Sequence, residues 1–315
     1  MVVNPFLAAK QKPLVVGHRG VPHLHQENSL AGFRRAVALG IPAIELDVRL
    51  TRDGVAVVFH DPTLFRLTGK PRAVSDLTWD ELSKLRLRRG VRMGLDESGS
   101  PIHMRYEREE PIPLFAEVLA EVASSAVINV ELKLDLERWW PTAIGSVAAK
   151  LIADAKAEDR VIVTSFDLRK LREAQRTHPG LALGFCFDDT MLNFASGILE
   201  RLPAIHARLG VHERHPNERA RRVLNRILDS HVIARLVDSR VIGADHTLVG
   251  EDTVTMLHKR GVAIGTHTLF PLGTTAGTKP LASSASTERE VERLVGLGVD
   301  WIESDDPERL LKLVG

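Results

Sequence analysis

Short apolar runs alternate with longer amphipathic stretches along most of the chain. The runs are rich in Val, Ile and Leu, which is typical of strands in a parallel sheet that is buried on both faces. Eight such runs are expected to form strands: Leu14–Gly17, Ala43–Val48, Val127–Lys133, Val161–Phe166, Leu181–Phe187, Val241–Asp245, Val262–Thr266 and Asp300–Glu303.

The stretches between these runs are helix-like, and several follow a Ser, Thr or Asp that can cap a first turn. Six are expected to be helical: Ser29–Leu39, Leu114–Ala123, Glu137–Ala157, Leu168–Arg176, Asp252–Lys259 and Thr287–Leu297. Eight strands with intervening helices predict a closed (β/α)8 TIM barrel, in which the chemistry lies at the C-terminal ends of the strands. An open doubly wound sheet is the alternative.

Two segments depart from the repeat. Residues 62–110 are rich in Arg, Gly and Asp, with one short helix-like piece at Ser75–Arg86, so we expect a loop-like insertion after the second strand. Residues 192–240 are helical and basic in pattern and contain the run Arg214–Arg222, which is typical of a solvated helix face. Contact with phosphate or with a membrane is the alternative for this run. Residues 1–315 are therefore expected to form a single TIM-barrel domain with one insertion.

Composition narrows the function. The 315 residues are 44% hydrophobic and 26% charged, as in a globular protein, and their net charge of +1 argues against a nucleic-acid partner. The single cysteine, Cys186, cannot form an internal disulfide or a thiolate zinc site and is expected in a buried strand. Because there is no secretory signal and no apolar run of transmembrane length, we expect a cytoplasmic protein.

Two carboxylates share one face of the second predicted strand. Glu45 and Asp47 are two residues apart, so their side chains point to the same side. The alternative is a surface strand on which both acids are solvated, but such a strand would expose the apolar residues that alternate with them. Carboxylates held close together repel each other unless a positive group lies between them, and a hard divalent cation is the simplest such group.

The next segment predicts a hairpin. Asp53-Gly54 is a strong two-residue turn signal, and a turn centred there places His60 directly opposite Asp47. An antiparallel return also explains how so few residues join them without a crossover helix.

Further charged residues stand at the ends of other predicted strands. Glu131 and Lys133 are two apart near the end of the third barrel strand, and His18 and Arg19 follow the first strand between Gly17 and Gly20. Three acids, two histidines, an Arg and a Lys at one barrel mouth suit an anion that is bridged to a hard metal.

This ordered set of motifs resembles the glycerophosphodiester phosphodiesterase family over nearly the whole chain. The matching segments are His18-Arg19-Gly20, Gln26-Glu27-Asn28-Ser29, Glu45-Leu46-Asp47-Val48, Thr51-Arg52-Asp53-Gly54, His60-Asp61, Glu131-Leu132-Lys133, Ser165-Phe166 and the stretch Gly298–Pro307. The resemblance implies a TIM barrel with an insertion after the second strand and a metal-dependent phosphoric diester hydrolase of lipid and glycerol metabolism. Its substrates would be glycerophosphodiesters, which it would cleave to sn-glycerol 3-phosphate and an alcohol.

The resemblance also implies roles for individual residues. Glu45, Asp47 and Glu131 would hold one divalent cation, Mg²⁺ or Ca²⁺. His18 and His60 would be the general acid and base, and Arg19 and Lys133 would hold phosphate oxygens. Two routes stay open, attack by the glycerol hydroxyl to give a cyclic phosphate and direct hydrolysis by water.

Some residues depart from the family pattern. Gln26 replaces a proline, and Gly265-Thr266-His267-Thr268 replaces W-T-V-N, followed by a Gly/Thr/Ser-rich segment to Ser286. Because of these changes, the resemblance does not assign the residues that line the leaving-group side of the site. The candidates to line it are Phe185, Phe187, His246 and His267, although a structural role is equally open for the two histidines.

Rival functions use the same residues differently. A lysophospholipase D or sphingomyelinase D-like phosphodiesterase would need a mouth that accepts an alkyl chain. A non-enzymatic barrel that binds phosphorylated ligands would be expected to lack one of the two histidines, and both are present. A zinc hydrolase is disfavoured because the proposed ligands are carboxylates rather than clustered His or Cys. Nothing in the sequence indicates the oligomeric state.

Overall fold

The computed structural model describes residues 4–8, 10–133, 143–188, 224–225, 227–228, 237–272 and 283–315. Most of the basic stretch 192–240, part of the expected helix Glu137–Ala157, and much of the Gly/Thr/Ser-rich segment lie outside the described residues. The statements below refer to the described part of the chain.

Eight parallel strands close into a barrel. They are β1 (Leu14–Gly17), β2 (Ala43–Leu50), β8 (Val127–Leu132), β9 (Val161–Ser165), β10 (Ala182–Phe187), β11 (Ser239–Asp245), β12 (Ala263–Leu269) and β13 (Trp301–Ser304). β1 pairs in parallel with both β13 and β2, which closes the ring and excludes the open sheet. All eight predicted strands are confirmed.

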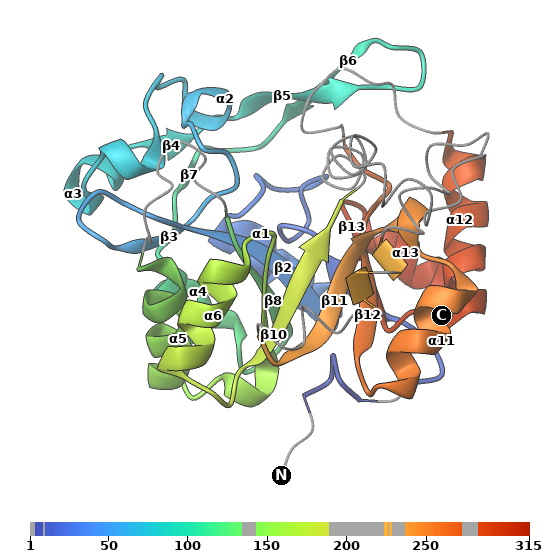
Figure 1. Ribbon diagram of the computed structural model, residues 1–315. Helices are drawn as coiled ribbons and strands as arrows, with labels where there is room; N and C mark the ends of the chain where they lie inside the picture. Colours follow the sequence, from blue (N-terminus) through green and yellow to red (C-terminus); the bar gives the residue numbers. More distant parts are fainter. Residues whose placement is uncertain are drawn as a thin grey trace, which may run out of the picture.

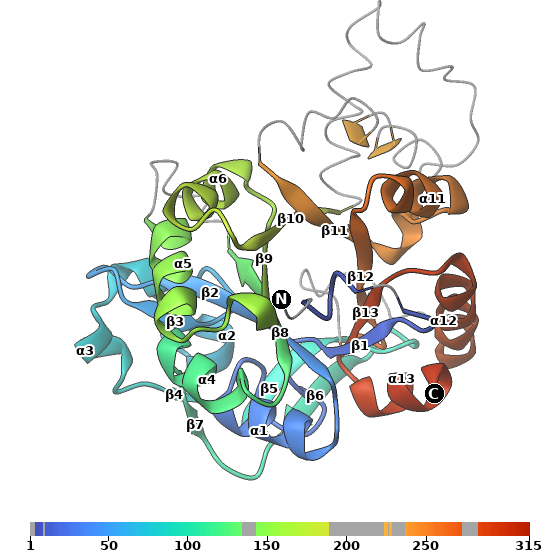
Figure 2. The ribbon, with the colours of Figure 1, turned by 90° about the horizontal axis from the view of Figure 1, so that it is seen from below.

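Helices surround the barrel (Figure 2). They are α1 (Leu30–Ala38), α4 (Phe115–Val122), α5 (Ile144–Asp154), α6 (Leu168–Thr177), α11 (Glu251–Lys259), α12 (Ser284–Leu297) and α13 (Pro307–Val314), with short 3-10 turns η2 (Glu158–Arg160) and η3 (His246–Leu248). The side chains of Ser29, Asp167 and Ser283 accept hydrogen bonds from the first turns of α1, α6 and α12, as capping residues do. Only α13 was not expected, although Asp306 caps it and Pro307 begins it.

The inside of the barrel changes from apolar to polar along its axis. A buried cluster at the N-terminal ends of the strands consists of Phe6, Val16, Ala43, Val127, Ile162, Ala182, Val241, Ala263 and Trp301. The Trp301 ring packs edge-on against Phe6, at 5.6 Å between centroids, and fills the space beside Gly265, where a Cβ atom would lie 1.8 Å from the indole. Because side chains alternate along β2, Glu45 and Asp47 share the inner side with Ala43 and lie nearer the C-terminal ends.

The insertion after the second barrel strand has more structure than a loop. Its elements are α2 (Phe65–Thr68), η1 (Val74–Asp76), α3 (Trp79–Leu82), β4 (Arg86–Leu87), β5 (Gly90–Leu95), β6 (Pro101–Arg105) and β7 (Glu110–Pro111). A second buried cluster, which includes Leu64, Leu67, Val74 and Leu82, holds them together. The expected loop-like character is therefore wrong. The sequence did not reveal these short elements, because their apolar residues are spaced too irregularly to mark any single helix or strand. The expectation of one domain over residues 1–315 stays a prediction.

The insertion lies at the C-terminal ends of the barrel strands, with β5 and β6 along the top of Figure 1. The turn between β5 and β6 contacts the beginning of α12, where Ser284 N–H donates to Glu97 Oε1 at 2.9 Å. The insertion therefore reaches from the β2 side of the barrel to α12.

The predicted hairpin is present, but its register differs by one residue. β3 (Ala56–Val58) runs antiparallel to β2, with Val48 opposite Val58, so Phe59 and not His60 faces Asp47. The loop has three residues instead of two: Thr51 N–H donates to Val55 O, and Gly54, with φ of 79°, forms the left-handed position that such loops require.

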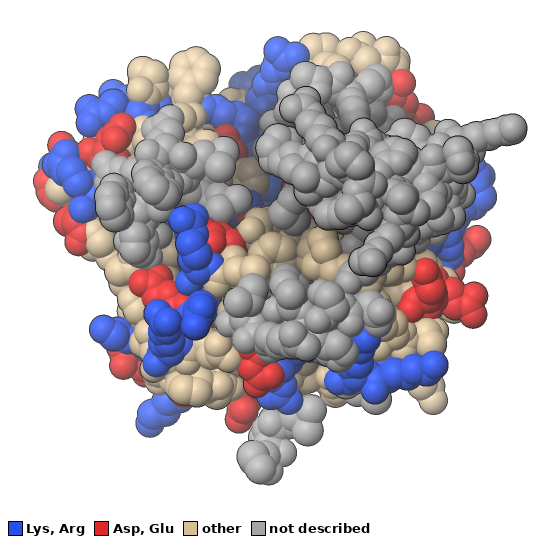
Figure 3. Space-filling model, in the orientation of Figure 1, with Lys and Arg blue, Asp and Glu red and all other residues tan. Residues whose placement is uncertain are grey.

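On the face drawn in Figure 3, basic and acidic side chains are interspersed rather than segregated. Among the described residues, no helix is long and apolar enough to cross a membrane. The cytoplasmic location stays a prediction.

Candidate active site

The residues singled out from the sequence come together at one end of the barrel. They are His18, Arg19, Glu45, Asp47, His60, Glu131 and Lys133. They lie in, or directly after, β1, β2, β3 and β8, which are neighbours in the sheet. Parallel strands place their C-terminal ends at the same edge, and for this reason residues far apart in sequence meet here.

Three carboxylates offer a cation-sized site. Oxygen atoms of Glu45, Asp47 and Glu131 lie within 4.8 Å of one another. Glu45 Oε1 and Asp47 Oδ1 are buried and accept no hydrogen bond in the described structure. Burial and the neighbouring Asp47, Glu303 and Glu131 raise the pKa of Glu45 well above its ordinary value. Unsatisfied buried carboxylate oxygens suit a hard divalent cation, so the residues present fit such an ion.

Two fixed cations flank these acids. Lys133 Nζ lies 2.7 Å from Glu131 Oε1 and 3.3 Å from Asp47 Oδ1. Arg19 Nε lies 3.3 Å from Asp47 Oδ2, and its backbone N–H donates to Glu45 Oε2 at 3.0 Å. Burial alone would raise the pKa of Asp47, but Lys133, His60 and Arg19 outweigh burial and lower it, so Asp47 is ionised.

The loop after β1 holds Asp47 from the other side. Asn28 has a φ of 57°, and its side chain donates to Asp47 Oδ2 at 2.7 Å while accepting from the Asp47 backbone N–H at 3.2 Å. Asparagine tolerates this left-handed conformation better than most residues. The paired bonds fix the position of the Asp47 carboxylate.

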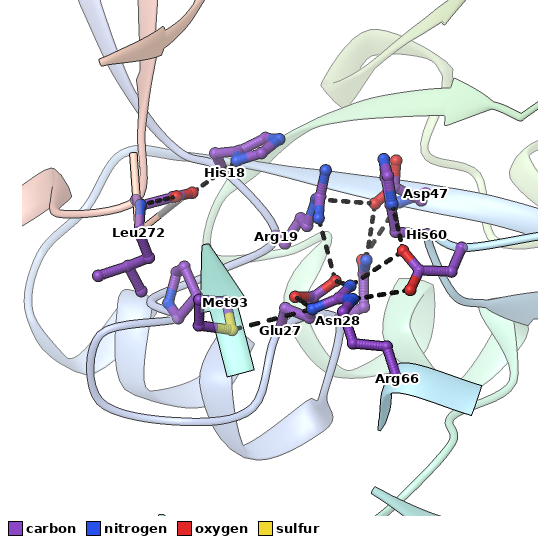
Figure 4. A network of polar contacts seen from close by, with 12 residues as sticks. His18, Arg19, Glu27, Asn28, Asp47, His60, Arg66, Met93 and Leu272 are labelled. Atoms are coloured by element: carbon purple, nitrogen blue, oxygen red, sulfur yellow. Dashed lines mark hydrogen bonds and ion pairs between the residues drawn. The ribbon is translucent and has the colours of Figure 1, made fainter. Parts of the chain in front are cut away.

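Each imidazole is held through Nδ1 by a carboxyl group. His18 Nδ1 lies 2.6 Å from Asp305 Oδ1, and His60 Nδ1 lies 2.8 Å from Asp61 Oδ1. Figure 4 shows both histidines beside Arg19 and Asp47. His18 Nε2 lies 3.8 Å from Glu45 Oε2, so its ring faces the carboxylate cluster.

Electrostatics favour a neutral His60. Burial, followed by Arg19 and Lys133, lowers the pKa of His60 to about 4. The pKa of Asp61 is lowered as well, because hydrogen bonds from His60 and Arg66 outweigh its burial. An ionised Asp61 can only accept a hydrogen bond, which places the His60 proton on Nδ1 and leaves a lone pair on Nε2.

His60 reaches this position without the predicted register. The Arg49 guanidinium donates to the His60 carbonyl oxygen from Nε and Nη2, at 2.9 and 2.7 Å. These two bonds, from a side chain of β2 to the backbone of His60, position the chain as it leaves β3.

Several polar residues of the site were not predicted to have a role. These are Glu27, Asn28, Asp61, Arg66, Asn129, Glu303 and Asp305. Five of them lie within motifs already noted in the sequence, and that proximity was the available signal: Glu27, Asn28, Asp61, Glu303 and Asp305. Asn129 and Glu303 meet across the barrel: Thr164 Oγ1 donates to Asn129 Oδ1 at 2.8 Å, and Asn129 Nδ2 donates to Glu303 Oε1 at 2.7 Å.

The four residues that were expected to line the leaving-group side lie in different environments. Phe185 and Phe187 are buried in the cluster between sheet and helices, so they do not line the mouth. His246 is bound by Glu290 at 2.7 Å, as a structural histidine is. His267 is half-buried and packs edge-on to Phe166, at 6.0 Å between ring centroids.

Known proteins resemble this chain over most of its length. A sequence model described as the glycerophosphoryl diester phosphodiesterase family matches residues 18–309. A glycerophosphodiester phosphodiesterase of Caldanaerobacter subterraneus subsp. tengcongensis is 29% identical over 304 residues, covering 96% of this chain and 98% of that protein. One of Bacillus altitudinis is 28% identical over 303 residues, covering 95% and 97%.

Solved structures share the fold. A glycerophosphoryl diester phosphodiesterase from Parabacteroides distasonis has a TM-score of 0.60 and 23% identity, covering 99% of this chain and 90% of that chain. A phosphodiesterase from Oleispira antarctica, solved in complex with the product sn-glycerol-3-phosphate, has a TM-score of 0.61 and 18% identity, covering 96% and 97%. Fold and site define a TIM barrel with a carboxylate-rich mouth that can accept a cation. The chain belongs to the glycerophosphoryl diester phosphodiesterase family.

Proposed function

We propose that the protein is an enzyme that hydrolyses glycerophosphodiesters to sn-glycerol 3-phosphate and an alcohol, with a divalent cation as cofactor. The observation that carries the proposal is the pair of buried oxygens of Glu45 and Asp47 that accept no hydrogen bond, beside two imidazoles that are held by carboxyl groups. Family membership and the names of the full-length relatives support the same reaction.

Glu45, Asp47 and Glu131 would hold the cation, either Mg²⁺ or Ca²⁺, because all three offer hard oxygen ligands. When bound, it would neutralise negative charge on the phosphoryl group. Arg19 and Lys133 would bind phosphoryl oxygens, since both lie against the same carboxylates and remain charged at neutral pH.

His60 is assigned as the general base and His18 as the general acid. The lowered pKa of His60 leaves its Nε2 lone pair available at neutral pH to accept a proton from the nucleophile. The nucleophile is water in direct hydrolysis, or the glycerol hydroxyl group if a cyclic phosphate forms first and water then opens it. Asp305 and Glu45 lie on either side of His18 and would balance the charge of an imidazolium that donates its proton to the leaving alcohol.

The test is a hydrolysis assay on glycerophosphocholine, glycerophosphoethanolamine and glycerophosphoinositol, with lysophosphatidylcholine and sphingomyelin as competing substrates, each with Mg²⁺ or Ca²⁺. We expect release of sn-glycerol 3-phosphate, and a fall of about 10²–10⁴-fold in His18→Ala and His60→Ala. The substitution His246→Ala is the matched control, because His246 is bound by Glu290 outside the carboxylate cluster. Preferred cleavage of lysophosphatidylcholine or sphingomyelin, or full turnover in either histidine variant, would refute the proposal.

A further inference from the structure

One cation at the edge of the site belongs to the insertion. Arg66 lies on α2, and its guanidinium donates to Asp61 Oδ2 from Nε at 2.7 Å and to Asp61 Oδ1 from Nη2 at 2.9 Å. On its other side it donates to Glu27 Oε2 from Nη1 and to Glu27 Oε1 from Nη2, both at 2.7 Å. The single guanidinium thus binds both oxygens of two carboxylates (Figure 4).

Both carboxylates have a second partner in the proposed site. Asp61 holds His60 Nδ1, and Glu27 Oε1 accepts from Arg19 Nη1 at 3.0 Å. Arg19 in turn contacts Asp47. Arg66 therefore links the carboxylate that holds His60, the proposed base, to the carboxylate that holds Arg19, which is proposed to bind phosphate.

Charge explains why a cation is needed at this place. Ligand atoms of Glu27, His60 and Asp61 lie within 4.8 Å of one another, close enough to hold a metal ion. Glu27 is only 2% exposed, and two carboxylates at this spacing would otherwise repel each other. The Arg66 guanidinium supplies the positive charge, and its planar fork satisfies both carboxylates in a way that a lysine ammonium does not.

We propose that Arg66 is a positioning residue, through which the insertion orients His60 by way of Asp61 and Arg19 by way of Glu27. The inference rests on the proposed function, because it assigns Arg66 to the same reaction. α2 is part of the insertion, and Arg66 also contacts Met93 of β5, with 3.8 Å between Nη1 and Sδ. The insertion thereby contributes a side chain that reaches the site through its bonds to Asp61 and Glu27.

The experiment compares Arg66→Ala and Arg66→Lys with the wild type. We expect kcat to fall about 10–100-fold in Arg66→Ala, as when a group that orients an active-site ligand is removed. Arg66→Lys should recover little, and added guanidinium ion should restore part of the activity of Arg66→Ala but not of the wild type. Arg72→Ala is the matched control, since Arg72 is an exposed residue of the same insertion that pairs only loosely with Asp76, at 3.7 Å.

A second measurement does not depend on turnover. In proton NMR, the Nδ1 proton of His60 should be protected from exchange in the wild type, lost in Arg66→Ala and recovered on adding guanidinium. If the wild type cleaves no glycerophosphodiester, the proposed function fails and this resonance still decides the role of Arg66. If Arg66→Ala does not fold, Arg66→Lys decides instead. Wild-type kcat together with an intact His60 resonance in either folded variant overturns the inference.

Discussion

At the scale of single residues, the site consists of acids whose neighbours divide them into two kinds. Glu27, Asp47 and Asp61 each face fixed cations, and these cations lower their pKa values although burial acts in the opposite direction. Glu45 and Glu303 have no lysine or arginine side chain paired with them in the described structure, and burial raises their pKa values. Such a separation of pKa values among neighbouring carboxyls is typical of catalytic sites.

Sequence motifs predicted some of these residues and not others. Glu45 and Asp47 are recognisable because their two-residue spacing puts both on one strand face. Glu303 lies in the noted stretch Gly298–Pro307, but nothing in that stretch indicates that it will meet Asn129 across the barrel. Arg66 could not be predicted either, because it binds Glu27 from a part of the chain 39 positions away.

Glu27 gives a prediction about stability and pH. Burial opposes its ionisation, but Arg66 and Arg19 outweigh burial and lower its pKa to about 2, from an ordinary 4.5. A lowered folded-state pKa gives a contribution that is fully present above the unfolded value and is lost as the pH falls from about 4.5 towards 2. That shift corresponds to about 3 kcal/mol.

We therefore expect wild type and Glu27→Gln to differ in unfolding free energy at pH 7 and to converge as the pH approaches 2. Denaturant unfolding in EDTA measures this without a contribution from bound metal. A gap of constant size between pH 7 and pH 2.5 would contradict the assignment.

At the scale of elements, all eight barrel strands and the antiparallel hairpin were predictable because each depends on local pattern. The register of the hairpin was not, since a two-residue and a three-residue loop can both contain Asp53-Gly54. In the three-residue loop, the Asp53 carboxylate accepts from Thr51 Oγ1 within the loop and from the Trp79 backbone N–H outside it. The latter bond comes from the insertion, whose structure the local pattern did not reveal.

Lengthening this loop by one residue tests what the register does. An Ala inserted between Asp53 and Gly54 would shift β3 against β2 and exchange the environments of Val57 and Val58, which are buried in different clusters. It would also displace the His60 carbonyl from Arg49. We expect turnover to fall by about 10²–10⁴-fold, as for loss of the base, while calcium binding followed by calorimetry changes little.

The same insertion beside Gly99, in the exposed turn between β5 and β6, is the matched control and should leave turnover near the wild-type value. Near-normal turnover in the Asp53 variant would show that His60 is positioned independently of the hairpin.

At the scale of the whole molecule, the mouth joins parts of the chain that are far apart in the sequence. Glu45 and Asp47 belong to β2 and Glu131 to β8, Asp305 follows β13, and Arg66 comes from the insertion. Barrel closure was predictable from the count of strands. The convergence of the insertion on the mouth was not, because it depends on side-chain bonds such as those of Arg66 to Asp61 and Glu27, which no local pattern marks.

The mouth brings the carboxyl groups of Glu45, Asp47 and Glu131 close together. Removing the metal should show how much their mutual repulsion lowers the stability of the fold. Without a cation, Glu45 is a buried carboxyl with one unbonded oxygen beside two other acids, an arrangement that destabilises the fold. Glu45→Gln removes the ionisable group and keeps an oxygen that can accept from the Arg19 N–H. In EDTA, this variant should therefore unfold at the same temperature as the wild type or higher, the opposite of what most core substitutions do.

Saturating Ca²⁺ or Mg²⁺, at about 100 times its Kd, should stabilise the wild type by about 2.7 kcal/mol and leave Glu45→Gln nearly unchanged. Glu121→Gln alters an exposed ion pair between Glu121 of α4 and Arg34 of α1, and this variant should respond to the cation as the wild type does. Scanning calorimetry with and without EDTA measures all three proteins, and an equal rise in Tm for wild type and Glu45→Gln would show that the cation binds elsewhere.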